Sequence, residues 1–420
     1  MKLMHVNRKK ITFVAALLLG AALLPACANV TAQPTPTATP PVTIGEASYA
    51  DGRGLQLGFH LLYAMDAGSG NGVLGTTSLS GVLAAAKYGA AGNTANALES
   101  QLGMQGMLPR QINEVALRMR QAVEKLKFGR FTTAWCMVFG NGQYVKEGFL
   151  TDTRQMLQMK SLFPSVPMEG ESGQAYLDEW ADDNTGGREK KLGFMVPEAN
   201  APFFVDILTA DPDWQLALDT GKSRPLPFVM EGGQETAVPT LVCYQSCGVY
   251  SSVDGAVAVL PLAGDETRLV VMMPPEDMSL REFIPVAAAR HDEWLGKAEW
   301  SKQRVLLPRF SLEYAGSVMP VLEQAGLSQY LGEGSDYSGM GKGLYISDVL
   351  HKASLVVDES GLEEPDPTVT YRRGVKDDIP TLAVNRPFLV LLERTDPSGF
   401  NEGQILMMGF VRDPLAAAIK

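Results

Sequence analysis

Apolar residues follow different spacings in the two halves of the chain. Residues 55–64 open with apolar side chains at helical spacing, and residues 80–88 continue apolar and alanine-rich up to Gly89. The second half contains short apolar or alternating runs bounded by Gly, Pro, Asp and Glu, which predict strands at residues 257–262, 268–273, 305–312, 353–357, 388–393 and 405–411. Helices followed by many strands predict an α+β fold with large, mainly antiparallel sheets.

The first residues have the pattern of an export signal. Basic residues at positions 2 and 8–10 precede an apolar run over residues 11–24, and the sequence Leu-Pro-Ala-Cys ends at Cys27. Small and apolar residues before a cysteine resemble the bacterial lipobox, where cleavage makes the cysteine the new N-terminus and its sulfur carries lipid. An ordinary signal with a chance cysteine and a short membrane anchor are the alternatives, although the run is short for a membrane span.

We therefore expect a lipoprotein signal peptide at residues 1–26, lipidation of Cys27 and export to the cell envelope, on its extracytoplasmic face or outside the cell. Residues 27–45 are rich in Thr, Pro and Ala, which cannot bury a core and favours an extended tether. No second linker, repeat or low-complexity stretch interrupts residues 46–420. One continuous body is the simplest organisation, although length alone would allow two or three domains.

Charge and cysteine spacing exclude several functions. The chain carries a formal charge of −11, and its leader contributes basic residues but no acid, so nucleic-acid binding is not expected. Cys136, Cys243 and Cys247 lack the Cys-x-x-Cys spacing of zinc or redox sites. They are expected to be buried thiols, with one disulfide left open, and no metal or cofactor is implied.

An enzyme would need catalytic residues that this sequence does not group together. After the leader only His60, His291 and His351 are available as histidine bases or ligands, and none sits in a recognisable constellation. There is no His-Glu-x-x-His, no Gly-x-Ser-x-Gly and no P-loop, because the glycine-rich residues 332–343 lack the Ser or Thr that should follow the lysine. These glycines predict a surface loop, and His351 is expected to be a hydrogen-bonded core residue.

The C-terminal region carries a specific resemblance. Residues 382–392 read Leu-Ala-Val-Asn-Arg-Pro-Phe-Leu-Val-Leu-Leu and resemble, position by position, the segment that follows the reactive loop of serpins. A closing strand at residues 403–411 with Pro414 follows, and residues 344–353 resemble the strand that leads into the loop.

Further matches occur in family order. They are residues 307–313, residues 336–339, Trp180 with Thr185 and Gly187 (where Asp178 replaces an Asn), Trp214, and Gly89, Ala90, Gly92 and Thr94. The resemblance covers about residues 55–414. It implies a single serpin-type domain of three mainly antiparallel β-sheets with eight to nine helices, an exposed reactive-centre loop and a monomeric state.

The resemblance also implies a mechanism without a conventional active site. A protease cleaves the loop, the loop inserts as a new strand in the main sheet, and the acylated protease is carried along and distorted. The positions that govern sheet opening are Ser80, Asp206, Trp214 and His351, of which we expect Ser80, Asp206 and His351 to form a hydrogen-bonded cluster. Residues 77 and 78 read Thr-Ser where the family has Ser-Pro.

The hinge, here residues 359–367, departs most from the family. Glu359, Ser360 and Gly361 keep the usual approach, but the run of small residues that should follow is replaced by Leu362, Glu363, Glu364, Pro365, Asp366 and Pro367. On an inserted strand, alternation would bury the carboxylates of Glu364 and Asp366. The two prolines would leave consecutive acceptors on one flank unpaired. We therefore expect a loop that resists insertion.

Two functions fit these features. In the first, residues 362–381 are bait for a serine or cysteine protease, with cleavage in the region of Arg372, Arg373, Val375 and Lys376. In the second, the chain is a non-inhibitory serpin, a surface binding or structural module whose loop is cut as an ordinary substrate. Family membership favours the first and the hinge favours the second.

Overall fold

A computed structural model describes residues 53–140, 142–156, 162–163, 170–197, 201–219, 221–363, 379–395 and 402–416. By its contacts the chain divides into Met1–Pro40 and Pro41–Lys420, and every described residue belongs to the second unit. The expected signal, the tether, Cys27 and most of the loop after the hinge lie outside the described residues.

A five-stranded sheet forms the centre of the described body. Its strands are β2 (Arg130–Val138), β3 (Leu162–Phe163), β4 (Phe203–Asp211), β11 (Phe310–Ser317) and β12 (Asp348–Val357), in the order β11-β12-β4-β2-β3. The β4–β12 and β2–β3 pairs are parallel and the other two are antiparallel. The neighbours β4 and β12 are therefore joined through a long stretch of intervening chain rather than a hairpin.

The largest sheet has nine strands. Its path is β1 (Gly72–Leu74), β16 (Gln404–Val411), β15 (Phe388–Arg394), β9 (Thr267–Met273), β8 (Gly255–Pro261), β7 (Glu235–Ser252), β10 (Glu299–Pro308) and β14 (Thr381–Ala383), with β6 (Arg224–Val229) paired to β7 off this path. A small third sheet joins β5 (Trp214–Leu216) to β13 (Gly361–Glu363).

Eight α-helices lie in the described part of the chain, with two short 3₁₀ turns at Ala263–Asp265 and Ser328–Tyr330. They are α2 (Leu55–Met65), α3 (Thr76–Gly89), α4 (Gly92–Gln101), α5 (Pro109–Glu124), α6 (Glu147–Met156), α7 (Gly170–Asn184), α8 (Leu280–Lys297) and α9 (Met319–Gln324). None of these described helices is long and apolar enough to cross a membrane.

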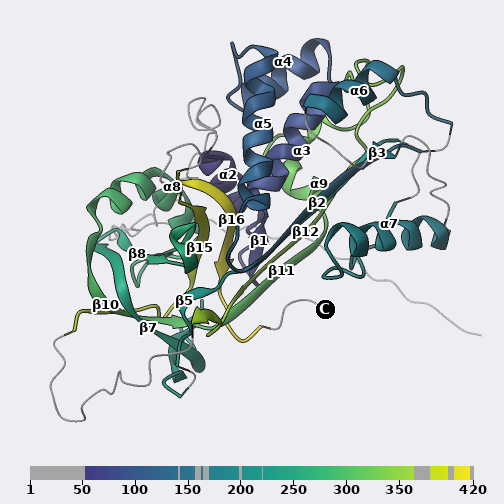
Figure 1. Cartoon of the computed structure of the whole chain (residues 1–420). Helices are drawn as coiled ribbons and strands as arrows, with labels where there is room; N and C mark the ends of the chain where they lie inside the picture. The colour runs from purple at the N-terminus through teal and green to yellow at the C-terminus, as the bar shows by residue number, and fades with distance from the viewer. Residues whose placement is uncertain are drawn as a thin grey trace, which may run out of the picture. The chain divides into compact units, whose positions relative to one another are not determined.

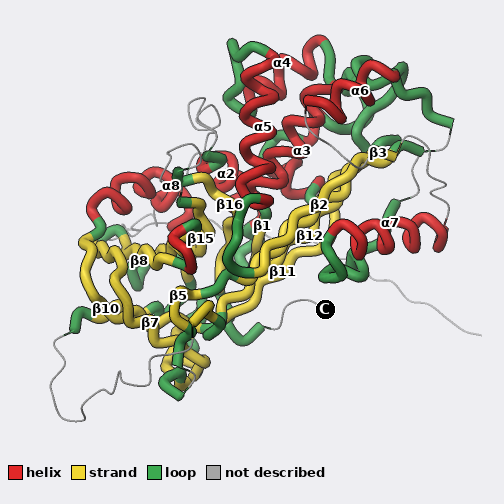
Figure 2. Tube along the Cα trace, viewed as in Figure 1, coloured by secondary structure: helices red, strands yellow, loops and turns green. Residues whose placement is uncertain are grey.

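Alternation along β4 explains how the helices cover the central sheet. Phe203, Val205 and Ile207 pack against α7, whereas Phe204 faces the core formed with α3. Figure 1 shows α7 on one side of β2 and β12 and the group α3–α6 on the other, and Figure 2 shows the same layers with strands in yellow. The side chain of Asp206, an even-numbered residue, therefore points toward α3.

The helix α8 is fixed by its own sequence. Ser279 accepts a hydrogen bond from the backbone N–H of Glu282 while the Glu282 side chain returns to the backbone of Ser279, a capping box. Its buried residues follow helical spacing and cover the face of β8, β9 and β15: Leu280, Phe283, Ile284, Ala287, Ala288, His291 and Trp294. The polar residue in this apolar stripe is His291.

The α+β expectation is confirmed, with one correction. Residues 305–312, expected as a single strand, belong to two strands in different sheets, β10 and β11, which meet at Arg309. The backbone N–H of Arg309 donates to the carbonyl of Pro239, so the chain turns from one sheet into the other at this residue. An unbroken apolar run does not reveal this change, because residues on both sides face cores.

Candidate functional site: the central seam and the hinge

The central seam is the parallel ladder between β4 and β12. Residues 203–210 of β4 pair with residues 348–355 of β12 without interruption, so no strand lies between them (Figure 1). An inserted strand would have to separate this ladder.

A buried polar cluster crosses the seam. His351 of β12 lies directly opposite Asp206 of β4, and its Nδ1 is 2.7 Å from Asp206 Oδ2. The other ring nitrogen, Nε2, accepts a hydrogen bond from the backbone N–H of Gly75 at 3.0 Å. Because Nε2 is an acceptor, the single ring proton is on Nδ1 and donates to Asp206. His351 is therefore neutral and ties both strands to the start of α3.

A third side chain, Ser78 of α3, completes the cluster. Its hydroxyl is 2.8 Å from Asp206 Oδ2, whereas Oδ1 of the same carboxyl is buried without a hydrogen-bond partner among the described residues. Asp206 and His351 are fully buried. Since a buried polar group without a partner costs about 1–3 kcal/mol, the two donors to Oδ2 are needed to hold this carboxyl in the core.

The expectation that Ser80 joins this cluster is wrong. Ser80 Oγ donates to the carbonyl of Thr76 in its own helix at 2.7 Å, and Ser78 is the serine that reaches Asp206. Two residues along a helix are about 200° apart, so Ser78 and Ser80 cannot point the same way. The start of α3 at Thr76 decides which one faces β4.

Trp214 lies beyond the end of β4 and holds the chain that leads into the hinge. Its indole Nε1 donates to the carbonyl of Asp358 at 2.7 Å, and its backbone N–H donates to the carbonyl of Ser360 at 2.9 Å. The backbone N–H of Leu218 donates to the carbonyl of Glu359, also at 2.9 Å. The first hinge residues are therefore bonded to the segment after β4.

Gly361 allows this close approach. A Cβ atom at this position would lie 2.3 Å from the backbone N of Ala217 and 2.5 Å from its Cα. Any other residue would push the two chains apart. The parallel pairs Gly361 with Trp214 and Glu363 with Leu216 depend on this contact.

Acidic residues surround the end of the seam. Burial raises the pKa of Asp211, the last residue of β4; the Arg130 cation opposes this, while the carboxylates of Asp358 and Asp213 add to it. Glu359 lies 3.6 Å from Arg309. A hinge with further carboxylates would enter the sheet at a place that already carries excess negative charge.

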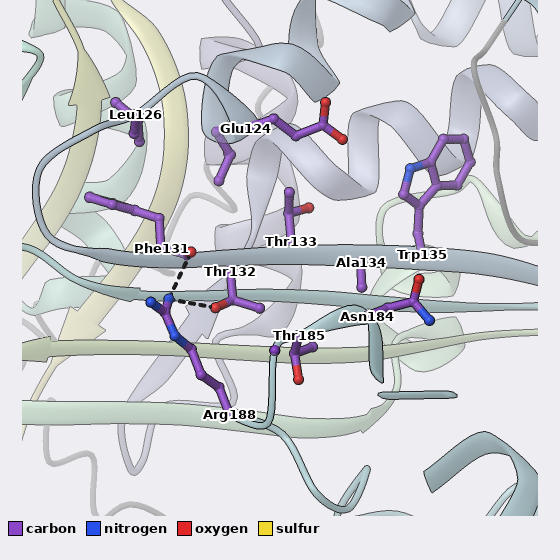
Figure 3. Close-up of a pocket in the computed structure, with 12 residues that line it drawn as sticks. Glu124, Leu126, Phe131, Thr132, Thr133, Ala134, Trp135, Asn184, Thr185 and Arg188 are labelled. Carbon is purple, nitrogen blue, oxygen red and sulfur yellow. Dashed lines mark hydrogen bonds between the residues drawn. The ribbon is translucent and has the colours of Figure 1, made fainter. Parts of the chain in front are cut away.

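A groove opens at the outer edge of β2, one strand away from the seam (Figure 3). Its volume is about 640 Å³, and it lies between the end of α5, β2 and residues 184–188. Arg188 reaches over the strand edge and donates to the carbonyl of Phe131 and the hydroxyl of Thr132. A separate small inner cavity beside Ser78 shares the lining residues Val123, Thr133 and Trp135 with the groove.

Comparison with known proteins identifies the fold. The family model described as "Serpin (serine protease inhibitor)" matches residues 54–414. The chain belongs to the serpin family. Human neuroserpin is 24% identical over 75% of this chain and 82% of its own length, and intracellular coagulation inhibitor 2 of Tachypleus tridentatus is 23% identical over 85% and 89%.

Two solved structures share the fold of this serpin. Mouse protein-Z dependent protease inhibitor superposes with a TM-score of 0.74 at 18% identity, covering 88% of this chain and 98% of its own. Tengpin, a thermophilic serpin in its native state, gives 0.75 at 20% identity, covering 88% and 95%. The expected serpin fold is confirmed, and this serpin belongs by family to protease inhibitors and their non-inhibitory relatives rather than to enzymes.

The expected site residues of this serpin fall into three groups. Asp206 and His351 meet in the cluster, and Trp214 contacts the approach to the hinge rather than that cluster. The backbone of β13 includes Leu362 and Glu363. Outside the described residues lie Cys27, Glu364, Pro365, Asp366, Pro367, Arg372, Arg373, Val375 and Lys376.

Two groups in the site of this serpin were not expected from the sequence. The backbone N–H of Gly75 has no sequence signal. Asp358 accepts hydrogen bonds through both its carbonyl, from Trp214, and its side chain, from the backbone N–H of Ser360. The three cysteines of the described residues are buried free thiols, and no disulfide joins any two of them: Cys136, Cys243 and Cys247. Within the described residues no cluster of His, Cys, Asp or Glu could hold a metal ion.

Proposed function

We propose that this serpin presents residues 362–381 as bait to a serine or cysteine protease, from an exported body that a lipid on Cys27 holds at the cell envelope. The observation that supports this proposal most is where the two ends of the loop are attached. Its start pairs with β5 through β13, and its end pairs with β10 through β14, a strand of a different sheet. The bait positions Arg372, Arg373 and Lys376 belong to the segment between these two attachments.

Basic residues in the bait suit a trypsin-like protease. Arginine and lysine are read by an acidic specificity pocket, and the region around Val375 and Lys376 is where the cleaved bond is expected. Protein-Z dependent protease inhibitor and intracellular coagulation inhibitor 2 are named as inhibitors among the similar proteins, which supports a protease as the partner.

The hinge favours cleavage without trapping. Insertion would separate the continuous β4–β12 ladder and bury Glu364 and Asp366 next to the acidic end of β4. Each unpaired buried group costs about 1–3 kcal/mol, and Pro365 and Pro367 add missing N–H donors. The second candidate, a non-inhibitory module cut as a substrate, rests on this observation.

Incubation with a set of serine and cysteine proteases distinguishes the two outcomes. If the bait is read, cleavage will occur within residues 364–380, and mass spectrometry will locate the bond. A complex that survives denaturant would mean that the protease is trapped, which would contradict the hinge argument. Resistance of this loop to every protease tested would contradict the bait itself.

The matched control is a triple variant, Arg372→Gln, Arg373→Gln and Lys376→Gln. It removes the basic bait without touching the hinge. Trypsin should cut the loop of this variant far more slowly, whereas a protease with apolar specificity should cut it as before.

A further inference from the structure

A row of alternating charges runs through the contact between α8 and the nine-stranded sheet. Asp292 of α8 lies 2.8 Å from both Arg53 and His291, and Glu393 of β15 lies 2.5 Å from His291 and 2.8 Å from Arg268 of β9. Arg268 also lies 3.5 Å from Glu402. In order, the row is Arg53, Asp292, His291, Glu393, Arg268 and Glu402.

The geometry at His291 determines its charge. Nδ1 faces Asp292 Oδ1 and Nε2 faces Glu393 Oε1, so both ring nitrogens point at carboxylate oxygens within hydrogen-bonding distance. A neutral imidazole has one N–H and one lone pair, and the lone pair would repel the oxygen that it faces. An imidazolium donates to both. His351 differs, because one of its nitrogens accepts from a backbone N–H.

The surroundings agree with a charged ring. The side chains of His291 and Glu393 are fully buried, and the ring of Phe59 from α2 meets the imidazole edge-on at 6.4 Å. Burial alone would lower the pKa of His291, but the charges and hydrogen bonds of Glu393 and Asp292 outweigh it and raise the pKa to about 8.

Both carboxylates shift in the complementary direction. Burial raises the pKa of Glu393, but His291 and Arg268 outweigh it, so that the net pKa is lowered. Hydrogen bonds from His291 and Arg53 lower the pKa of Asp292. Removing the proton from His291 would leave Arg268 as the one cation in contact with the buried Glu393 among the described residues.

We propose that His291 is an imidazolium that locks α8 onto β15 and β9, and that alkaline pH releases this lock. The folded protein holds the proton more tightly than the unfolded chain, where histidine has its usual pKa of 6.5. The stabilisation is therefore fully present below about pH 6.5, falls as the pH rises, and is lost above about pH 8.

The direct test is ¹⁵N NMR of the full chain labelled at histidine nitrogens, with His291→Gln used to assign the signal. At pH 7 both nitrogens of His291 should have imidazolium shifts and should titrate near pH 8. His351 should show a neutral ring with its proton on Nδ1. A neutral His291 at pH 7 would overturn the proposal.

Glu393→Gln removes one charge while keeping the shape of the side chain. We expect the pKa of His291 to fall to 6.5 or below, because burial remains. The matched control is Glu293→Gln on the exposed face of α8, where the carboxylate binds Arg290 and Lys297. It should leave His291 unchanged, and equal shifts in both variants would overturn the role of Glu393.

Hydrogen exchange of the wild-type protein tests the lock even where Glu393→Gln fails to fold. After correction for the intrinsic rates, the amides of α8 should lose roughly tenfold or more of their protection between pH 6.5 and 9. The amides of α3 should not. Parallel loss in both helices would mean that no local lock exists.

Discussion

Two buried histidines are held in opposite protonation states by what their second nitrogen faces. His351 meets a backbone N–H from Gly75 and is neutral, whereas His291 meets two carboxylates and is charged. Both are fully buried, so burial alone does not decide the state. The number and kind of neighbours decide it.

Ser78 and Asp206 are expected to be energetically coupled across the seam. Ser78→Ala leaves Asp206 with His351 as its remaining donor among the described residues, and should destabilise the fold by about 1–3 kcal/mol. A double-mutant cycle with Asp206→Asn, measured by urea denaturation, should give a coupling energy of about 1 kcal/mol or more. Additive effects would mean that the 2.8 Å contact contributes nothing.

Gly361→Ala should detach the hinge from β5. The added Cβ would overlap the backbone of Ala217, so the pairing of β13 is lost and its amides exchange faster with solvent. Overpacking of this kind costs about 1–3 kcal/mol. Gly296→Ala in α8 is the control, since its Cβ would meet nothing within 4 Å and helix propensity favours alanine. Unchanged exchange at residues 361–363 would contradict the close contact.

At the scale of elements, the start of the hinge forms a short strand, β13, that follows the long strand β12. β12 pairs with β4 as far as Leu355 and ends at Val357, and three residues later the chain pairs again, with β5. Trp214 and Leu218 bond the carbonyls in between. Insertion of the hinge between β4 and β12 would therefore first have to break these hydrogen bonds.

Limited proteolysis should cut first within residues 364–380. Both flanks are bonded into sheets, through β13 and β14, whereas the largely polar segment between them contains three prolines and three basic residues. Brief digestion with trypsin followed by intact mass measurement locates the first product. An initial cut in the helices α3–α6 would contradict the assignment of the loop.

The fold could be predicted because the motifs that resemble serpins occur along the sequence in family order, and several of them form neighbouring strands. Residues 388–393 and 405–411 are adjacent antiparallel strands, and His351 and Asp206 are direct partners in the seam. The expectation that Ser80 joins the cluster was wrong because the serine that faces β4 depends on where α3 begins, which is uncertain by one or two residues from sequence. The bond from Gly75 involves only backbone, which no side-chain pattern encodes.

At the scale of the whole molecule, the seam is closed, because β4 and β12 pair directly with each other. A serpin that inserts its cleaved loop gains a central strand and much stability. This chain would have to separate eight paired residues on each strand and bury hinge carboxylates to do so. The state of the central sheet is therefore expected to survive loop cleavage.

Cleavage of the loop should change thermal stability little. A rise in melting temperature above about 10 °C, equivalent to several kcal/mol, would contradict the hinge argument. The matched variant replaces Leu362 with Thr and residues 364–367 with Ala, which restores small residues without altering Arg372, Arg373 or Lys376. If that variant gains stability on cleavage and the wild type does not, the hinge alone prevents insertion. If neither gains, a feature outside the hinge also prevents insertion, and Asp206 and Ser78 are the next positions to substitute.

Cys27→Ser should release the protein from membranes. The lipid is proposed to be attached to this sulfur, at the head of the Thr- and Pro-rich residues 27–45, so its loss removes the anchor. Fractionation of cells that express each form, followed by detection of the body, measures the change. Equal retention of the two forms in the membrane fraction would contradict lipidation at this position.

The parallel seam also has a consequence for the order of folding. His351 and Asp206 are 145 residues apart in the chain, so β4 is synthesised long before its partner β12. Closing so large a loop is entropically costly, and contacts of this separation slow folding. During synthesis the edge of β4 is therefore left open until β12 has been made, and a chaperone that shields a bare strand edge would act on this edge in that interval.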